Sequence, residues 1–207
     1  MVIAIDGPAG AGKSSVARAA AERLGFTYLD TGAMYRCVAL DVSERGGEPA
    51  EVAEALEIEL GDRVLLDGRD VTDAIRTPAV SAASSRVSAD IGVRMALVRK
   101  QQEILEEGDW VAEGRDIGTV VCPNAAVKVF LTATPEVRAQ RRAEELSAEY
   151  EAVLEEQLQR DERDERREHS PLIAANDAVP VDTTTLDLEG VLDQILTLVV
   201  EAKEIEA

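Results

Sequence analysis

The sequence predicts an α/β fold with a five-stranded parallel sheet flanked by helices. Short apolar runs rich in β-branched residues alternate with segments of helical composition, which is typical of a parallel sheet with helices on both faces. The predicted strands are Val2–Asp6, Phe26–Leu29, Asp109–Glu113, Ala126–Leu131 and Ala178–Asp182. A chain of 207 residues suits a single domain, residues 1–207, with a sizeable core.

Helices are predicted from composition, apolar spacing and end signals. Residues 15–24 are rich in helix formers and end at Gly25, a good C-cap. Residues 186–196 carry apolar side chains at helical spacing and are predicted to pack as the closing helix.

A long detour, about residues 41–108, separates the second and third predicted strands. Within it, residues 63–71 indicate a hairpin with an Asp-Gly turn, and residues 81–107 indicate one helix. Such an insertion is either a surface elaboration or a cap over a second substrate.

Charge and cysteine content narrow the class of protein. The net charge of −19, from 22 basic and 41 acidic residues, disfavours binding to a nucleic-acid polymer or an anionic membrane. Cys37 and Cys122 are far apart and outside any metal-binding motif, as expected for a reducing, cytoplasmic location. The apolar run 195–200 is too short to span a bilayer. No obvious dimer seam is present, so a monomer is expected.

The octapeptide after the first strand predicts a phosphate-binding loop. It reads Gly7, Pro8, Ala9, Gly10, Ala11, Gly12, Lys13 and Ser14, and so matches G-x-x-x-x-G-K-[ST] between a strand and a helix. Its glycines leave backbone N–H groups accessible to phosphate oxygens, and the following helix directs its positive end at them. Lys13 is expected to reach the β- and γ-phosphates of a nucleoside triphosphate, and the Ser14 hydroxyl to bind Mg²⁺.

Arginines follow two of the other strands. Arg36 and Arg115 come shortly after the second and third strands, where parallel sheets bind their ligands. Guanidinium groups pair bidentately with phosphate, so a phosphate-bearing acceptor is one interpretation and ordinary surface ion pairs are the other. The base-reading motif of GTPase switches is absent, and residues 111–116 depart from the strand of motor-type ATPases.

A charged segment, residues 160–167, carries further arginines. Arg160, Asp164 and Arg167 share one face of a predicted helix. The face is either solvated, with weak ion pairs, or part of a lid that delivers arginines to a triphosphate and excludes water.

The whole chain resembles the bacterial cytidylate kinases, also called CMP or dCMP kinases, of the P-loop nucleoside monophosphate kinase family. The resemblance is carried by Ile5–Ser14, Leu29–Arg36, Ile75–Thr77, Ala112–Val121, Arg160–Asp164 and Val181–Thr184. It implies a P-loop kinase core, an inserted CMP-binding subdomain at about 41–108 and a helical lid at about 147–170. It also implies transfer of the ATP γ-phosphate to CMP or dCMP, with Mg²⁺ and no covalent intermediate.

The resemblance also implies roles for individual residues. Gly7 to Ser15 and Arg141 would bind ATP, with Ser14 on the metal. The residues at the transferred phosphate would be Lys13, Arg36, Arg115 and Arg167. The acceptor would be held by Thr31, Tyr35, Arg36, Arg115 and Arg167, its cytosine by Ser85, Arg94 and Asp116, and its sugar by Arg160 and Asp164. Thr31 stands where the family commonly has serine, and the region after Gly46 is short.

Two other functions are compatible with the phosphate loop. One is a P-loop kinase for another small acceptor, such as UMP, AMP, shikimate or dephospho-coenzyme A. The other is a regulatory module that binds or hydrolyses a nucleotide.

Overall fold

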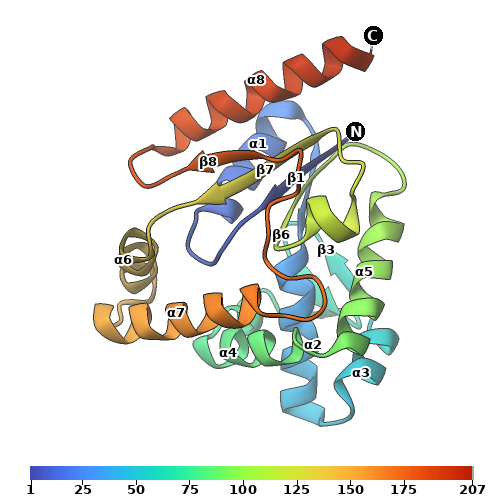
Figure 1. The fold of residues 1–207 in the computed structure, drawn as a ribbon. Coiled ribbons are helices and arrows are strands. Elements are labelled where there is room, and N and C mark those ends of the chain that lie inside the picture. Colours follow the sequence, from blue (N-terminus) through green and yellow to red (C-terminus); the bar gives the residue numbers. More distant parts are fainter. Residues whose placement is uncertain (207) are drawn as a thin grey trace. The chain divides into compact units, whose positions relative to one another are not determined.

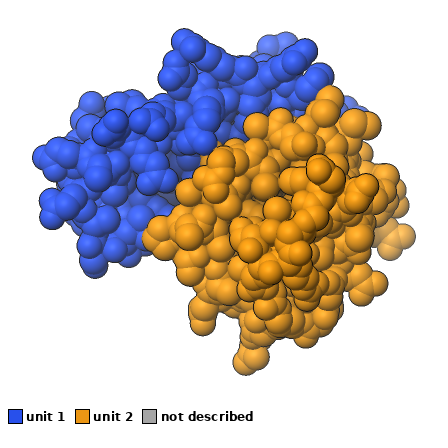
Figure 2. All heavy atoms as spheres, turned by 90° about the horizontal axis from the view of Figure 1, so that it is seen from below, with its two compact units in different colours: residues 1–28, 108–207 blue, residues 29–107 orange. Residues whose placement is uncertain are grey.

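The computed structural model describes residues 1–206, and side chains as far as residue 204. It contains two compact units, coloured separately in Figure 2. Unit 1 comprises Met1–Tyr28 and Gly108–Ala207, and unit 2 comprises Leu29–Glu107. None of the helices within residues 1–206 has the length and apolarity that a membrane span requires.

An all-parallel sheet has the strand order β2-β6-β1-β7-β8 (Figure 1). The strands are β1 (Val2–Asp6), β2 (Thr27–Asp30), β6 (Trp110–Gly114), β7 (Val127–Thr132) and β8 (Val179–Asp182). These bounds confirm all five predicted strands to within a single residue at each end. β1 is central, between β6 and β7, and Ile3, Ala4 and Ile5 are fully buried, which explains its continuous apolar run.

The register of the sheet brings two loops to one edge. Asp6, the last residue of β1, lies opposite Gly114, the last residue of β6. The phosphate loop and the Arg115-Asp116 segment follow these two residues directly. Both therefore begin at the carboxyl edge of the sheet, where parallel α/β folds bind ligands.

Four helices and one short turn complete unit 1 (Figure 1). They are α1 (Lys13–Leu24), α6 (Pro135–Leu146), α7 (Tyr150–Glu165), α8 (Leu188–Glu206) and the π-helical turn η2 (Ile117–Val121). α1 ends at Gly25, whose φ of 69° is left-handed, so the predicted C-cap is confirmed. The closing helix is also confirmed, although α8 continues well beyond the predicted end at residue 196.

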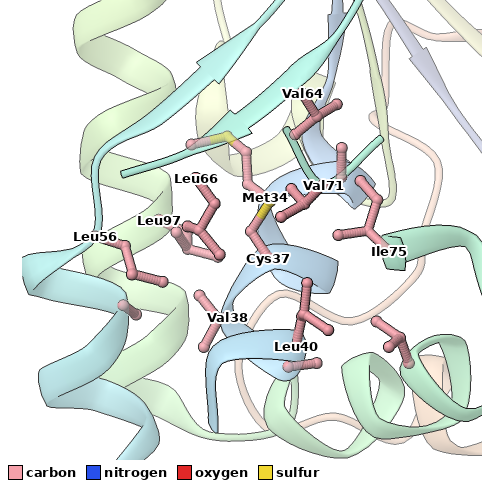
Figure 3. Close-up of a cluster of buried hydrophobic side chains, with 14 of the residues drawn as sticks. Met34, Cys37, Val38, Leu40, Leu56, Val64, Leu66, Val71, Ile75 and Leu97 are labelled. Atoms are coloured by element: carbon pink, nitrogen blue, oxygen red, sulfur yellow. The ribbon is translucent and has the colours of Figure 1, made fainter. Parts of the chain in front are cut away.

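Unit 2 has a small core of its own, shown in Figure 3. Its elements are α2 (Thr31–Arg45), α3 (Pro49–Ala55), β3 (Ile58–Leu60), β4 (Val64–Leu66), β5 (Arg69–Asp70), η1 (Ala74–Arg76), α4 (Pro78–Val87) and α5 (Ile91–Leu105). Met34 and Val38 of α2 pack with Leu66, Ile75 and Leu97 from the other elements. The unit begins at Leu29, before residue 41, because α2 packs on α3 and α4.

Two predictions for this region have different outcomes. The Asp-Gly hairpin is confirmed: β4 and β5 pair antiparallel, and Asp67 and Gly68 have φ values of 49° and 76°. The single helix over residues 81–107 is wrong, because α4 ends at Val87 and α5 begins at Ile91. The break lies at Asp90, whose carboxylate accepts the N–H of Val93 at 3.0 Å and so starts a new helix.

Candidate active site

The loop between β1 and α1 has the backbone of a phosphate cradle. Gly7, Gly10 and Gly12 have φ values of 149°, 76° and 87°. A Cβ atom at Gly7 would lie 2.2 Å from the carbonyl oxygen of Leu131, so this position requires glycine. Because α1 starts at Lys13, directly after the loop, its positive end lies beside the loop N–H groups.

Lys13 is a buried cation, with 7% of the residue exposed. Its Nζ donates a hydrogen bond to the carbonyl of Pro8 at 2.7 Å. Burial, followed by the positive charge of Arg115, lowers the pKa of Lys13 from 10.5 to about 7, and the Glu113 carboxylate acts in the opposite direction. An incoming phosphate would stabilise the charged ammonium, so the site favours an anion beside Lys13.

Asp6 links the end of β1 to the segment that follows Arg115. Its carboxylate accepts the backbone N–H groups of Ile117 and Gly118, both at 2.8 Å. Burial raises the pKa of Asp6 from 3.8 to about 6, and the two N–H groups oppose that shift. Asp6 thus fixes the start of η2. The one local sign of this role in the sequence is an acidic residue directly before the phosphate loop.

Replacing Asp6 by asparagine should lower the free energy of unfolding by about 1–3 kcal/mol near pH 5, since one amide oxygen cannot replace two acceptors. The folded pKa is raised, so the stability from the Asp6 proton is fully present below pH 3.8 and is lost as pH rises through about 6. The difference in the free energy of unfolding between the wild type and Asp6→Asn should therefore decrease by about 1.4 kcal/mol between about pH 5 and pH 7.5.

Urea unfolding of both proteins at the two pH values measures this change. Asp62→Asn, at an exposed loop position, is the matched control and should show no such change. A difference between wild type and Asp6→Asn that is constant with pH would mean that folded Asp6 stays ionised throughout.

Arg115, Asp164 and Arg167 form an ion cluster in unit 1. Arg115 donates from Nε to Asp164 at 3.1 Å, and Arg167 pairs with the other oxygen of the same carboxylate. Asp164 is 1% exposed, and although burial alone would raise its pKa, Arg115, Arg167 and Arg160 hold that pKa below its usual value. The interpretation of this helix face as solvated, with weak ion pairs, is therefore wrong for Asp164. The structure brings together these residues of the predicted site.

Arg141 is connected to the phosphate loop through Thr183. Arg141 donates from Nη1 to the Thr183 hydroxyl at 3.0 Å and from Nη2 to the Thr183 carbonyl at 2.6 Å. The Thr183 hydroxyl donates in turn to the carbonyl of Ala11 in the loop at 3.2 Å. Thr183 had no predicted role, because nothing in its local pattern indicates a contact with a loop far away in the sequence.

Asp116 and Arg160 are two further unit 1 residues expected to contact the acceptor, and Arg160 lies half-buried in α7. Asp116 is 5% exposed and directly precedes η2, and its carbonyl accepts the N–H groups of Val120 and Val121. The π-helical turn thus follows the Gly114-Arg115-Asp116 segment and fixes its backbone. The expected role of the Asp116 side chain in reading cytosine remains a prediction.

The other expected acceptor residues, namely Thr31, Tyr35, Arg36, Ser85 and Arg94, belong to unit 2. Arg94 is 4% exposed, donates to the carbonyl of Ser88 at 3.3 Å and has its guanidinium carbon 5.6 Å from the centre of the Tyr35 ring. The buried Ser85 hydroxyl has no hydrogen-bond partner in the described part of the chain. A buried arginine and an unsatisfied hydroxyl are unfavourable in a core and suit a polar ligand.

Arg36 and Thr31 lie in the first turns of α2. Arg36 pairs with Asp30 at 2.8 Å, and Asp30 also caps the helix by accepting the N–H of Ala33 at 2.9 Å. The side chain of Arg36 is 24% exposed, so ligand oxygens could reach it. Thr31 is buried, with 4% of the residue exposed.

Comparison with known protein families gives one assignment across the chain. The family model described as cytidylate kinase matches residues 3–201. The chain is 50% identical over 216 residues to the cytidylate kinase of Carboxydothermus hydrogenoformans, covering 96% of this chain and 97% of that protein. It is 48% identical over 217 residues to the cytidylate kinase of Geobacter sulfurreducens, covering 97% of this chain and 93% of that protein.

A third relative is longer. The bifunctional pantoate ligase/cytidylate kinase of Synechococcus sp. strain WH7803 is 49% identical over 212 residues, which is 94% of this chain and 43% of that protein. The chain thus spans less than half of the bifunctional relative.

Solved structures with the same fold include two kinases. A gluconokinase from Sinorhizobium meliloti has a TM-score of 0.55 at 18% identity, covering 99% of this chain and 95% of that chain. Shikimate kinase from Acinetobacter baumannii has a TM-score of 0.52 at 17% identity, covering 98% of this chain and 94% of that chain. At such low identity the likeness establishes the fold, which is that of the P-loop kinases.

Proposed function

Because the chain belongs to the cytidylate kinase family and is thus a phosphotransferase, we propose that it transfers the γ-phosphate of ATP to the phosphate of CMP or dCMP. The products are ADP and CDP or dCDP. The observation that carries the proposal is the buried Lys13 beside the phosphate loop, in the same unit as the Arg115-Asp164-Arg167 cluster.

The reaction needs no covalent enzyme intermediate. An oxygen of the acceptor phosphate forms a bond to the γ-phosphorus while the bond from that phosphorus to the bridging oxygen of ADP breaks. Negative charge accumulates on the transferring group, so the protein contributes by positioning and by cations. Lys13 serves this purpose from the donor side, and Arg115 and Arg167 stabilise the transferring group and the acceptor phosphate.

The ion cluster prepares these arginines before substrate arrives. Asp164 fixes the positions of both guanidinium groups, and its single negative charge leaves the two arginines with a net positive charge. Their fixed positions reduce the reorganisation needed when phosphate binds. Arg36 of unit 2, which pairs with Asp30, is proposed to contact the acceptor phosphate as well.

The residues present fit a Mg²⁺ ion. Ser14 follows Lys13 at the start of α1 and is exposed, so its hydroxyl is accessible to a metal bound with the triphosphate. When bound, Mg²⁺ would neutralise charge on the β- and γ-phosphates. The side chains of the protein hold and orient the phosphates around it.

Unit 2 is the proposed acceptor-binding part. The buried Arg94 and the unsatisfied Ser85 hydroxyl support recognition of a polar base edge. Asp116 is proposed to read the same base, and Thr31, Tyr35, Arg160 and Asp164 to contact the rest of the acceptor.

The surface that α7 buries supports a lid at about residues 147–170. From Gln157 onward its buried residues are Gln157, Asp161 and Asp164, which are polar and lie about one turn apart. Each is held by a hydrogen bond or an ion pair to Pro135, Arg138 and Arg115 respectively. Water can replace such contacts, so this part of the helix can detach without exposing a large apolar surface, whereas Val153 near its start packs against Ala139 and Ala143 of α6.

The lid should be cleaved readily by protease in the free protein and protected when ATP and CMP are both bound. Arg167→Ala should lower turnover by about 10²-fold, the effect of losing one cation at the transferring group. The fold should survive, because Arg115 still neutralises Asp164. Arg166→Ala is the matched control. The Arg166 side chain is 79% exposed, so this variant should keep full turnover. Equal cleavage with and without ligands would exclude a lid.

An acceptor panel tests the proposed function. ADP release should be stimulated by CMP and dCMP far more than by UMP, AMP, shikimate or water. A preference for another acceptor would make the protein a P-loop kinase of different specificity. A nucleotide-binding module with no acceptor would release ADP at one rate under all conditions.

A further inference from the structure

Arg138 of α6 is a buried arginine that the proposed chemistry does not use. It is 4% exposed. Its guanidinium donates from Nε to the carbonyl of Ala133 at 2.9 Å and from Nη1 to the carbonyl of Ala9 at 3.0 Å. Its Nη2 pairs with the carboxylate of Asp161 at 2.8 Å. One side chain thus joins the phosphate loop, the segment after β7 and the helix α7.

The phosphate loop also packs directly against these two helices. A Cβ atom at Gly10 would lie 2.9 Å from Cβ of Arg138 and 3.2 Å from Oε1 of Gln157 in α7. Gln157 itself donates to the carbonyl of Pro135 at 3.2 Å. A shift of the loop therefore affects Arg138 and α7 without an intervening element.

The pair between Arg138 and Asp161 is poorly suited to stabilising the fold. Both residues are at least nine-tenths buried, and the second carboxylate oxygen of Asp161 has no hydrogen-bond partner in the described part of the chain. Removing two charges from water is costly unless their remaining polar atoms are satisfied. An apolar pair would hold α6 to α7 at least as well, so the charged pair requires another explanation.

We propose that Arg138 is a positioning residue that couples occupancy of the phosphate loop to docking of α7. Its contact to Ala9 fixes the loop in the form that binds the triphosphate, and its contact to Asp161 holds α7 against α6. ATP on the loop stabilises the position of Ala9 and therefore of the guanidinium, which favours the docked helix. By reciprocity, the docked helix strengthens ATP binding by the same factor. The inference rests on the proposed function only in that ATP is the ligand of the loop.

Hydrogen exchange of the α7 amides, followed by mass spectrometry, tests the coupling with ATP alone and no acceptor. In the wild type, ATP should slow exchange in α7 by roughly 5- to 150-fold, the usual range for coupled sites. Arg138→Met and Asp161→Asn should each abolish this slowing, because they break the same link from opposite ends. The double variant should behave like either single variant.

A calorimetric titration provides a second readout that a purely structural role would not change in this way. The loss of ATP affinity in Asp161→Asn should equal the factor by which ATP slows α7 exchange in the wild type. Asp161→Asn keeps the size of the side chain and leaves Arg138 in place. It carries the test if Arg138→Met does not fold.

Matched controls come from the same helices. Arg142→Met removes an arginine of α6 that pairs with Glu145. Glu162→Gln changes a carboxylate that is next to Asp161 in the sequence and pairs with Arg166. Both should retain the ATP-dependent slowing.

Slowing that persists in Arg138→Met and Asp161→Asn, or that is absent from the wild type, would overturn the coupling. This outcome is independent of the acceptor. A protein that shows the coupling but no ADP release stimulated by CMP would overturn the proposed function and leave the role of Arg138 standing.

Discussion

Lys13→Ala should lower the turnover number with ATP and CMP by about 10²–10³-fold, the usual result of removing one electrostatic contact to a transferring group. The loop N–H groups remain in the variant, so ATP affinity should fall less than turnover. The effect should be large because the ammonium is buried and its charge is poorly screened. Initial rates of ADP release and a separate ATP titration measure the two quantities.

Lys203→Ala is the matched control for this experiment. Lys203 is an exposed lysine of α8 whose ammonium lies 5.4 Å from the centre of the Phe26 ring. Its loss should leave turnover unchanged. Near-normal turnover in Lys13→Ala would mean that the loop does not serve phosphoryl transfer.

CMP should be preferred over UMP by about 10²–10⁴-fold in kcat/KM. Cytosine presents an N4 amino donor beside an N3 acceptor, whereas uracil presents an O4 acceptor beside an N3–H donor. A carboxylate only accepts and a guanidinium only donates, so Asp116 facing N4 and Arg94 facing N3 would satisfy cytosine alone. Each buried mismatch costs about 1–3 kcal/mol, and uracil would create two.

Variants at the two positions separate base recognition from catalysis. Asp116→Asn and Arg94→Met should reduce the ratio of kcat/KM for CMP to kcat/KM for UMP, mainly by lowering the value for CMP. Arg99→Met is the matched control on α5, because the side chain of Arg99 is 55% exposed and pairs with Glu54, and it should leave the ratio unchanged. If Asp116→Asn slows both acceptors equally, Asp116 acts at the metal or phosphate and not at the base.

The sheet and the phosphate loop could be predicted because their signals are local. Buried parallel strands such as β1 consist of continuous apolar residues, and the spacing of glycines before Lys13 follows from the backbone that a phosphate requires. The Asp67-Gly68 turn was predictable for the same reason, since its left-handed backbone favours these residue types. The break between α4 and α5 also has a local signal, because Ser88, Asp90 and Gly92 are weak helix formers and Asp90 is a good N-cap, so the continuous helix was wrong on a pattern that the sequence contains.

The connections behind the site could not be predicted from local pattern. Asp6 bonds to residues more than a hundred positions away, and Thr183 contacts Ala11 across most of the chain. Arg138 resembles any helix arginine until the fold buries it against Ala9 and Asp161. The lowered pKa of Lys13 likewise depends on burial and on Arg115, which the tertiary structure supplies.

The polar surface that α7 buries has a thermal consequence. Exposure of apolar surface raises the heat capacity of a protein, whereas exposure of polar surface lowers it. Detaching the segment of α7 from Gln157 onward exposes Gln157, Asp161 and Asp164, so the heat-capacity change of this step should be close to zero or negative. The free energy of docking this segment should then vary almost linearly with temperature. Global unfolding, which exposes the apolar cores of both units, should show the strong curvature expected of a globular protein.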